Sequence, residues 1–168
     1  MHTFEHTVEI EAPIKHVFQW SIDLENWQRS MPSLARVEVT EDTDDGMQME
    51  VTYRILGRSV EGDMEFEVLE PGIHTVSVFK SPGMTGELHY RFAEIDSGTR
   101  IVQSCEYEFG DSLLERIIEP VAARYNRRQF KNSLMTSKEL IEAEVAEPDE
   151  EASAEDTVED EMVAGGGA

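Results

Sequence analysis

Apolar and polar residues alternate along much of the chain up to residue 109. In the first run, residues 3–11, one face carries Phe4, His6, Val8 and Ile10. The same period of two returns in residues 35–41, 46–54, 60–70, 87–94 and 99–109. It is typical of strands that bury one face and expose the other. Residues 73–81 also have strand composition, but their pattern leaves the buried face open. Turn-forming residues separate the seven runs, which predicts one antiparallel sheet.

A helical pattern lies between the first and second strands. Pro13 suits the first turn of a helix. The inner stripe of that helix is predicted to be Ile14, Val17, Phe18, Ser21 and Ile22. Asp23 can cap a second short helix, which carries Trp27 and ends before Pro32. We expect the two short helices to seal one end of a curved sheet, with the tryptophans bracing that corner.

A longer helical pattern follows the last strand. Ser112 and Glu115 have the spacing of a capping box. Apolar residues then form a stripe of Ile118, Ala122, Phe130, Leu134 and Ile141. Asn126 falls on the same stripe, and Pro120 is expected to kink the first turns. A sheet wrapped around this helix is an α+β architecture, and it leaves internal space only if the helix stands off the sheet.

The charge of the chain bears on its partners and its location. Among 168 residues, 36 are acidic and 14 basic, for a formal net charge of -22. Such a charge argues against a nucleic-acid or anionic-membrane partner, because phosphates are repelled at long range. No run of apolar residues is long enough for an integral membrane segment. The first residues show no secretory signal, so a cytoplasmic protein is expected. The single cysteine, Cys105, cannot form an internal disulfide.

The negative charge is concentrated towards the end of the chain. Residues 144–168 contain ten acidic residues, no basic residue and no aromatic residue. Such a segment cannot bury enough apolar surface to offset its chain entropy, which predicts a disordered acidic tail after a single domain of residues 1–143. Many acids and few lysines also give a haloarchaeal-type composition, in which a high-salt cytoplasm screens the self-repulsion. An ordinary acidic protein is the alternative.

The stretch from the first to the second strand resembles the START-related SRPBCC superfamily of polyketide cyclase/dehydratase-like proteins. The matching residues are Ala12, Pro13, Val17, Phe18, Asp23, Trp27 and Pro32. The resemblance extends over roughly residues 3–143. It implies a helix-grip fold, in which a curved seven-stranded antiparallel sheet wraps around a long C-terminal helix and encloses a deep apolar cavity. Members include ligand carriers, aromatase/cyclases and quinone-binding proteins, so the resemblance implies the fold without an activity.

The predicted inward positions supply the candidate ligand-binding residues. They are Met49, Tyr53, Met64, Phe66, Tyr90, Phe92, Tyr107, Asn126, His6 and Trp27. Methionine and aromatic side chains adapt well to apolar ligands, although each of them can equally serve as plain core packing. His6 is a candidate proton carrier if Tyr107 or Asn126 lies near it, and a satisfied histidine near a strand end is the alternative.

Patterns that would indicate a particular chemistry are missing from the sequence. No Asp or Glu falls on the inward face of a clearly patterned strand, so no carboxylate pair for acid–base catalysis is evident. The histidines lack metal-ligand spacing, and neither a phosphate loop nor a dinucleotide fingerprint occurs. No catalytic residue, metal or cofactor is therefore predicted. Five basic residues at positions 116–131 suit either an anionic head group or a solvated helix face.

Three functions are compatible with these observations. The first is binding or transport of a small hydrophobic molecule, such as a lipid, an isoprenoid or an aromatic compound, and it requires only an apolar cavity. The second is a polyketide cyclase/dehydratase-like enzyme that uses His6 or a tyrosine for proton transfer. The third is a quinone-binding helper protein of respiration. The sequence leaves the ligand, any reaction and the oligomeric state open.

Overall fold

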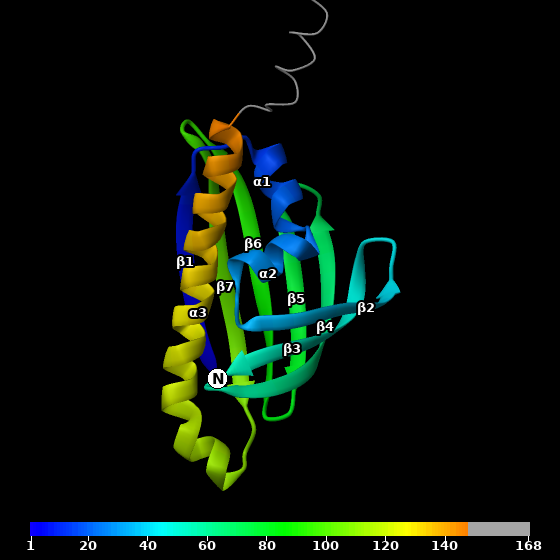
Figure 1. The fold of residues 1–168 in the computed structure, drawn as a ribbon, viewed down its shortest axis with the longest axis vertical. Helices are drawn as coiled ribbons and strands as arrows, with labels where there is room; N and C mark the ends of the chain where they lie inside the picture. Colours follow the sequence, from blue (N-terminus) through cyan, green and yellow to red (C-terminus); the bar gives the residue numbers. More distant parts are fainter. Residues whose placement is uncertain (148–168) are drawn as a thin grey trace, which may run out of the picture.

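The computed structural model describes residues 1–147, which form one curved antiparallel sheet and three helices (Figure 1). The strands are β1 (His2–Ile10), β2 (Leu34–Asp42), β3 (Gly46–Ile55), β4 (Arg58–Glu70), β5 (His74–Ser81), β6 (Met84–Ile95) and β7 (Gly98–Phe109). The helices are α1 (Ile14–Ser21), α2 (Leu24–Ser30) and α3 (Leu113–Ala146). Across the sheet the strands follow the order β1-β7-β6-β5-β4-β3-β2. This arrangement confirms the predicted helix-grip fold.

The burial of most strands follows the predicted alternation, whereas β2 is largely exposed after Leu34. On β1, Phe4, Val8 and Ile10 are buried and His6 is half-buried, while the residues between them are exposed. On β5, the strand whose buried face was left open, the inward residues are Thr75, Ser77 and Phe79. Gly86 on β6 allows the sheet to pack closely, because a Cβ there would lie 2.6 Å from the ring of Phe79 and 2.5 Å from the Cβ of Tyr107.

Each helix begins where the sequence predicts. Pro13 precedes α1, and the side chain of Asp23 accepts a hydrogen bond from the Glu25 backbone amide at the start of α2. Ser112 and Glu115 form both hydrogen bonds of the capping box at the start of α3. The first turns of α3 are set at an angle to the rest (Figure 1), as expected for Pro120 inside a helix.

One prediction for α3 is wrong at its first member. Ala122, Leu134 and Ile141 are buried, but the side chain of Ile118 is 46% exposed. At 3.6 residues per turn, a strict spacing of four residues drifts around the helix by about 40° at each step. Ile118 lies four such steps before Leu134, so its side chain points away from the face of the helix on which Leu134 is buried.

The backbones of the helices pack most closely on strands away from the centre of the sheet. Helix α3 packs on β1 and β7, α1 on β6 and β7, and α2 on β2 and α3. Two apolar clusters form the core, one built around Met49, Met64, Phe66 and Leu88 and the other around Ile10, Val17, Phe92 and Ile141. Tyr90 packs against both clusters. The central strands β4 and β5 therefore face an internal space between the sheet and the helices.

Helix α3 ends at Ala146. The division into a domain of residues 1–143 and an acidic tail stays a prediction. Most of the predicted acidic tail, residues 148–168, lies outside the described residues. None of the helices within residues 1–147 combines the length and the apolar character that a membrane span requires.

Candidate functional site

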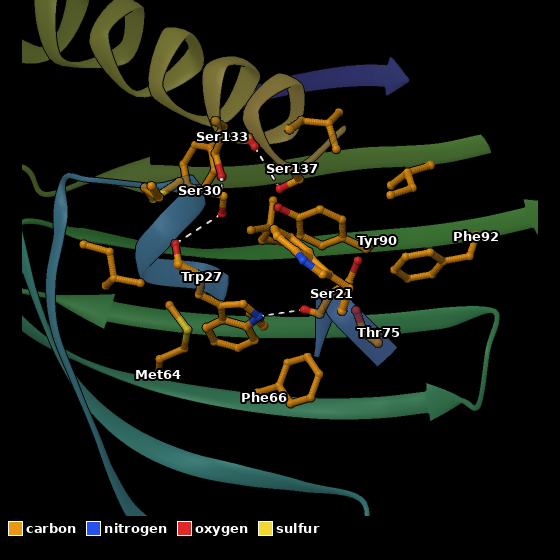
Figure 2. A pocket seen from close by; sticks show the side chains of 18 of the residues that line it. Ser21, Trp27, Ser30, Met64, Phe66, Thr75, Tyr90, Phe92, Ser133 and Ser137 are labelled. Atoms are coloured by element: carbon orange, nitrogen blue, oxygen red, sulfur yellow. Dashed lines mark hydrogen bonds between the residues drawn. The ribbon is translucent and has the colours of Figure 1, made fainter. Parts of the chain in front are cut away.

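A cavity lies between the concave face of the sheet and the three helices, where the two core clusters meet (Figure 2). Its free volume is about 80 Å³. That exceeds several-fold the ~10–15 Å³ that a single water molecule needs. The walls are formed by Trp20, Ser21, Trp27, Ser30, Met31, Leu34, Tyr53, Met64, Phe66, Thr75, Ser77, Leu88, Tyr90, Phe92, Ile101, Phe130, Ser133, Leu134 and Ser137.

Helices α1 and α2 bring both tryptophans of the chain to this cavity. Trp27 donates a hydrogen bond from Nε1 to the backbone oxygen of Ser21, at 2.7 Å, and its ring meets Phe66 edge-on at 5.2 Å. The Asn26 side chain donates to the backbone oxygen of Trp20 at 3.1 Å. These bonds satisfy the polar atoms at the junction of two short helices, so the corner packs as one unit.

Glu144, in the last turn of α3, connects that corner to the long helix. One carboxylate oxygen accepts from Trp20 Nε1 at 3.2 Å and from Arg29 Nη1 at 3.3 Å. His16 Nε2 lies 3.5 Å from the other oxygen. Arg29 also donates to the side-chain oxygen of Asn26 at 2.8 Å. A single carboxylate therefore ties both short helices to the last turn of α3.

The serines on the helix side of the cavity use their hydroxyl protons within the protein. Ser21 and Ser137 donate to backbone oxygens one turn earlier, at 2.7 and 2.9 Å, and Ser30 donates to the Trp27 backbone at 3.2 Å. Ser133 donates to the Ser30 hydroxyl at 3.4 Å. Figure 2 shows Ser30, Ser133 and Ser137 above the ring of Trp27, and Ser21 beside it. The hydroxyls of this group are already satisfied without a ligand.

Two tyrosines contribute the remaining phenolic groups. The Tyr90 hydroxyl accepts a hydrogen bond from Gln103 Nε2 at 2.7 Å, and Gln103 is fully buried. Burial raises the pKa of Tyr90 to about 12, and the nearby thiol of Cys105 adds to the rise. Burial likewise raises the pKa of Tyr53, with a further contribution from the neighbouring Tyr90 hydroxyl. Both phenols therefore stay protonated at neutral pH.

Among the described residues, nothing charged lines the cavity: its walls include no Asp, Glu, His, Lys or Arg. Within residues 1–147, no three His, Cys, Asp or Glu side chains gather in a way that could hold a metal ion. The chemistry of the cavity rests on apolar surface, aromatic rings and neutral hydroxyls.

Comparison with models of protein families shows to which family the chain belongs. The sequence model of a family described as "Polyketide cyclase / dehydrase and lipid transport" matches residues 1–142. The protein belongs to this family. Comparison with curated proteins gives no significant match.

Solved structures of low sequence identity share the fold of this chain. A protein from Thermus thermophilus superposes with a TM-score of 0.75 at 17% identity, covering 84% of this chain and 98% of its own. The Zhui aromatase/cyclase from a Streptomyces species gives 0.70 at 15% identity, with 82% and 93% covered. A START superfamily protein from Mycobacterium smegmatis gives 0.68 at 12% identity, with 84% and 99% covered.

Six of the ten candidate residues line the cavity of this family member. They are Trp27, Tyr53, Met64, Phe66, Tyr90 and Phe92. The alternation along the strands predicted that five of them point inward. The pattern of the short helices predicted the position of Trp27 at the corner.

The other four candidates lie elsewhere in the structure. Met49 is buried in the core and is the strand partner of Met64. Tyr107 stacks on His2, and its hydroxyl donates to the Ala123 backbone at 3.4 Å. Asn126 contacts the sulfur of Met84. These three point inward as expected, but side chains fill the space around them.

His6 does not line the cavity either, and none of the hydrogen bonds found within residues 1–147 joins it to Asn126 or Tyr107. Its ring stacks on Phe4, and Nε2 lies 3.3 Å from the Arg127 backbone oxygen. Burial lowers the pKa of His6. This is the satisfied histidine that the sequence offered as the alternative.

Sequence reasoning missed most of the residues that the helices contribute to the cavity wall. It also missed the two residues with hydroxyl groups that β5 contributes. Trp20 and Phe130 had signals as helical apolar residues, although nothing in the sequence marks Ser133 and Ser137 as facing a cavity. Thr75 and Ser77 were missed because the pattern of β5 did not show which of its faces is buried.

Proposed function

We propose that the protein binds a small, compact hydrophobic molecule in the cavity and carries it without converting it chemically. The observation that carries this proposal is the cavity wall, which combines aromatic rings, aliphatic side chains and neutral hydroxyls with no charged group among the described residues. Such a wall favours an apolar ligand through burial of its surface. A cavity of about 80 Å³ favours a small, compact molecule over a long lipid chain.

A cyclase-type enzyme is the second candidate. It is supported by similarity to the Zhui aromatase/cyclase and by two tyrosines that line the cavity. Against it, the cavity wall holds no carboxylate or imidazole among the described residues. A phenol whose pKa is raised to about 12 is a poor base at neutral pH, so proton abstraction by Tyr90 would be slow.

The test of carriage starts from protein purified gently from its own cells. Native mass spectrometry is expected to show an added mass of one small organic molecule, and extraction then gives its identity. Quinones and isoprenoids are examined among the extracted compounds. The extracted molecule should rebind to the ligand-free protein and quench the fluorescence of Trp20 and Trp27, the two tryptophans of the chain.

Two variants separate the cavity from other surfaces. Met64→Trp places a large ring in the cavity wall and should weaken rebinding more than tenfold, while costing about 1–3 kcal/mol of stability. Met135→Trp makes the same change at an α3 residue that is 42% exposed and outside the cavity wall, and it should bind normally. The proposal fails if both variants bind alike, or if incubation with the extracted molecule yields a new product.

A further inference from the structure

Two histidines meet on the outer face of the sheet, away from the cavity. His74 lies at the start of β5, and His89 lies in the middle of β6. Their neighbours Thr75 and Tyr90 line the cavity, so the alternation along each strand turns the two imidazoles to the opposite face. The two histidines are 15 positions apart in the sequence, and the pairing of the strands brings them together.

The two rings hold their nitrogens at the separation of a chelating pair. His74 Nε2 and His89 Nδ1 are 3.0 Å apart, and the ring planes are inclined by 36°. With metal–nitrogen bonds of about 2.0–2.1 Å, nitrogens at this separation subtend roughly 95° at a shared metal ion. That is close to the angle between neighbouring ligands in the square-planar and octahedral complexes of Cu²⁺ and Ni²⁺. In the metal-free pair one proton bridges the two nitrogens, and a metal ion can take its place after a small rotation of each ring.

Glu87 supports His89 from behind. Its carboxylate lies 3.5 Å from His89 Nε2, the ring nitrogen that does not face His74. This contact favours the tautomer that carries its proton on Nε2 and leaves a lone pair on Nδ1. Ligating histidines in metal sites typically have such a partner, because it fixes the orientation of the ring and raises its basicity.

The charges around the pair favour a cation. Glu70 on β4 and Arg91 on β6 are the register partners of His74, and both interact with it electrostatically. Arg91 repels a cation, whereas Glu70, Glu67 on the same face of β4, and Glu87 attract it. Three carboxylates against one guanidinium, in a chain with a net charge of -22, raise the local concentration of divalent cations.

We propose that His74 and His89 form a second binding site, which takes a divalent transition-metal ion such as Cu²⁺ or Ni²⁺ through their two imidazole nitrogens. Water molecules complete the coordination, so the site needs no third side chain. It is separate from the cavity and independent of the proposed function. Mg²⁺ and Ca²⁺ should not compete for it, because they prefer oxygen ligands.

The experiment titrates the full-length protein with Cu²⁺ and with Ni²⁺ by calorimetry, in excess Mg²⁺ to occupy surface carboxylates. The tightest-binding equivalent should depend on both histidines: His74→Gln and His89→Gln should each weaken it by roughly tenfold or more. Glu87→Gln should weaken it by a smaller factor. His2→Gln and His16→Gln are the controls, since each of these histidines also lies beside a carboxylate, and they should bind as wild type does.

A second measurement identifies the ligands directly. Electron paramagnetic resonance of the protein with one equivalent of Cu²⁺ should show coupling to two imidazole nitrogens in wild type and to one in His74→Gln. Both histidines lie on the outer face, so their variants should fold normally, which thermal unfolding checks. The inference is overturned by unchanged affinity in both variants, by a tightest site that depends on His2 or His16, by absent binding, or by a spectrum without two coupled imidazoles. Each of these outcomes leaves the proposed function standing, because that function is tested by rebinding of the extracted molecule.

Discussion

The two halves of α3 belong to one continuous helix but meet different surroundings. In the first half, Ile117 and Val121 are 69% and 61% exposed. In the second half, Leu134 and Ile141 are 3% and 0% exposed, and the helix faces the cavity and the short helices. The difference teaches that local signals such as the capping box decide where a helix forms. The elements that pack against the helix decide which of its residues are buried.

Charge follows the same division. Residues 113–131 hold five basic residues and two acidic ones, while residues 132–146 hold one basic and three acidic residues. The basic residues Arg116, Arg124, Arg127, Arg128 and Lys131 are exposed and none of them lines the cavity. The cluster therefore lies on a solvent-exposed face of the helix and does not reach the cavity. A solvated face was one of the two alternatives for it.

The largest expected effect comes from truncating one apolar residue in each half. Ile141→Ala should destabilise the protein by about 2–5 kcal/mol, because it leaves a hole in a fully buried position. Ile117→Ala makes the same change on the exposed half and should cost less than about 0.5 kcal/mol. Denaturant unfolding at equilibrium measures both. Similar losses in the two variants would contradict the division of the helix.

A smaller effect tests whether the exposed half is held by its own cap. Ser112→Ala should cost about 1 kcal/mol, since it removes the hydrogen bond to the Glu115 amide. Ser112→Asp keeps an acceptor at the cap and should restore most of that loss. If thermal unfolding shows no change for Ser112→Ala, the first half does not share in the cooperative unfolding of the domain.

The smallest effect concerns pH and the second half. Glu142 accepts a hydrogen bond from the Glu11 amide at 2.9 Å and pairs with Lys138, and these contacts lower its pKa, the backbone bond most. A lowered folded-state pKa adds stability that is present above the ordinary value of 4.5 and is lost as the pH falls through the folded-state pKa. Glu142→Gln should therefore be less stable than wild type at pH 7, by under about 1 kcal/mol.

At low pH that difference should disappear, because the wild-type carboxyl is then protonated as well. Urea midpoints of both proteins at several pH values measure the convergence. A constant difference across the whole range would assign the effect to packing rather than to the charge of Glu142.

The fold was predictable because its signals are local. Alternation marks strands wherever one face is wet, and Pro13, Asp23 and Ser112 mark helix starts through their own chemistry. The exception is β5, where Val76 and Val78 point away from the cavity while Thr75 and Ser77 face it. Residues with hydroxyl groups take the inward positions there, and valines take the outward ones. The usual rule that apolar residues mark the inward face therefore fails for this strand.

The site was predictable only in part because a cavity is a property of several elements at once. The alternation along a strand shows that Met49 and Met64 both point inward. It does not show that Met49 is enclosed by other side chains while Met64 borders the cavity. On α3, four residues reach the cavity because the helix packs on β1 and β7 and not on the central strands.

The position of Glu144 has a kinetic consequence. It belongs to the last turn of α3, and its carboxylate receives the hydrogen bonds of Trp20 and Arg29. Terminal turns fray more easily than the centre of a helix, and local opening costs much less free energy than global unfolding. Opening of this one turn should then free the corner formed by α1 and α2 while the rest of the domain stays folded.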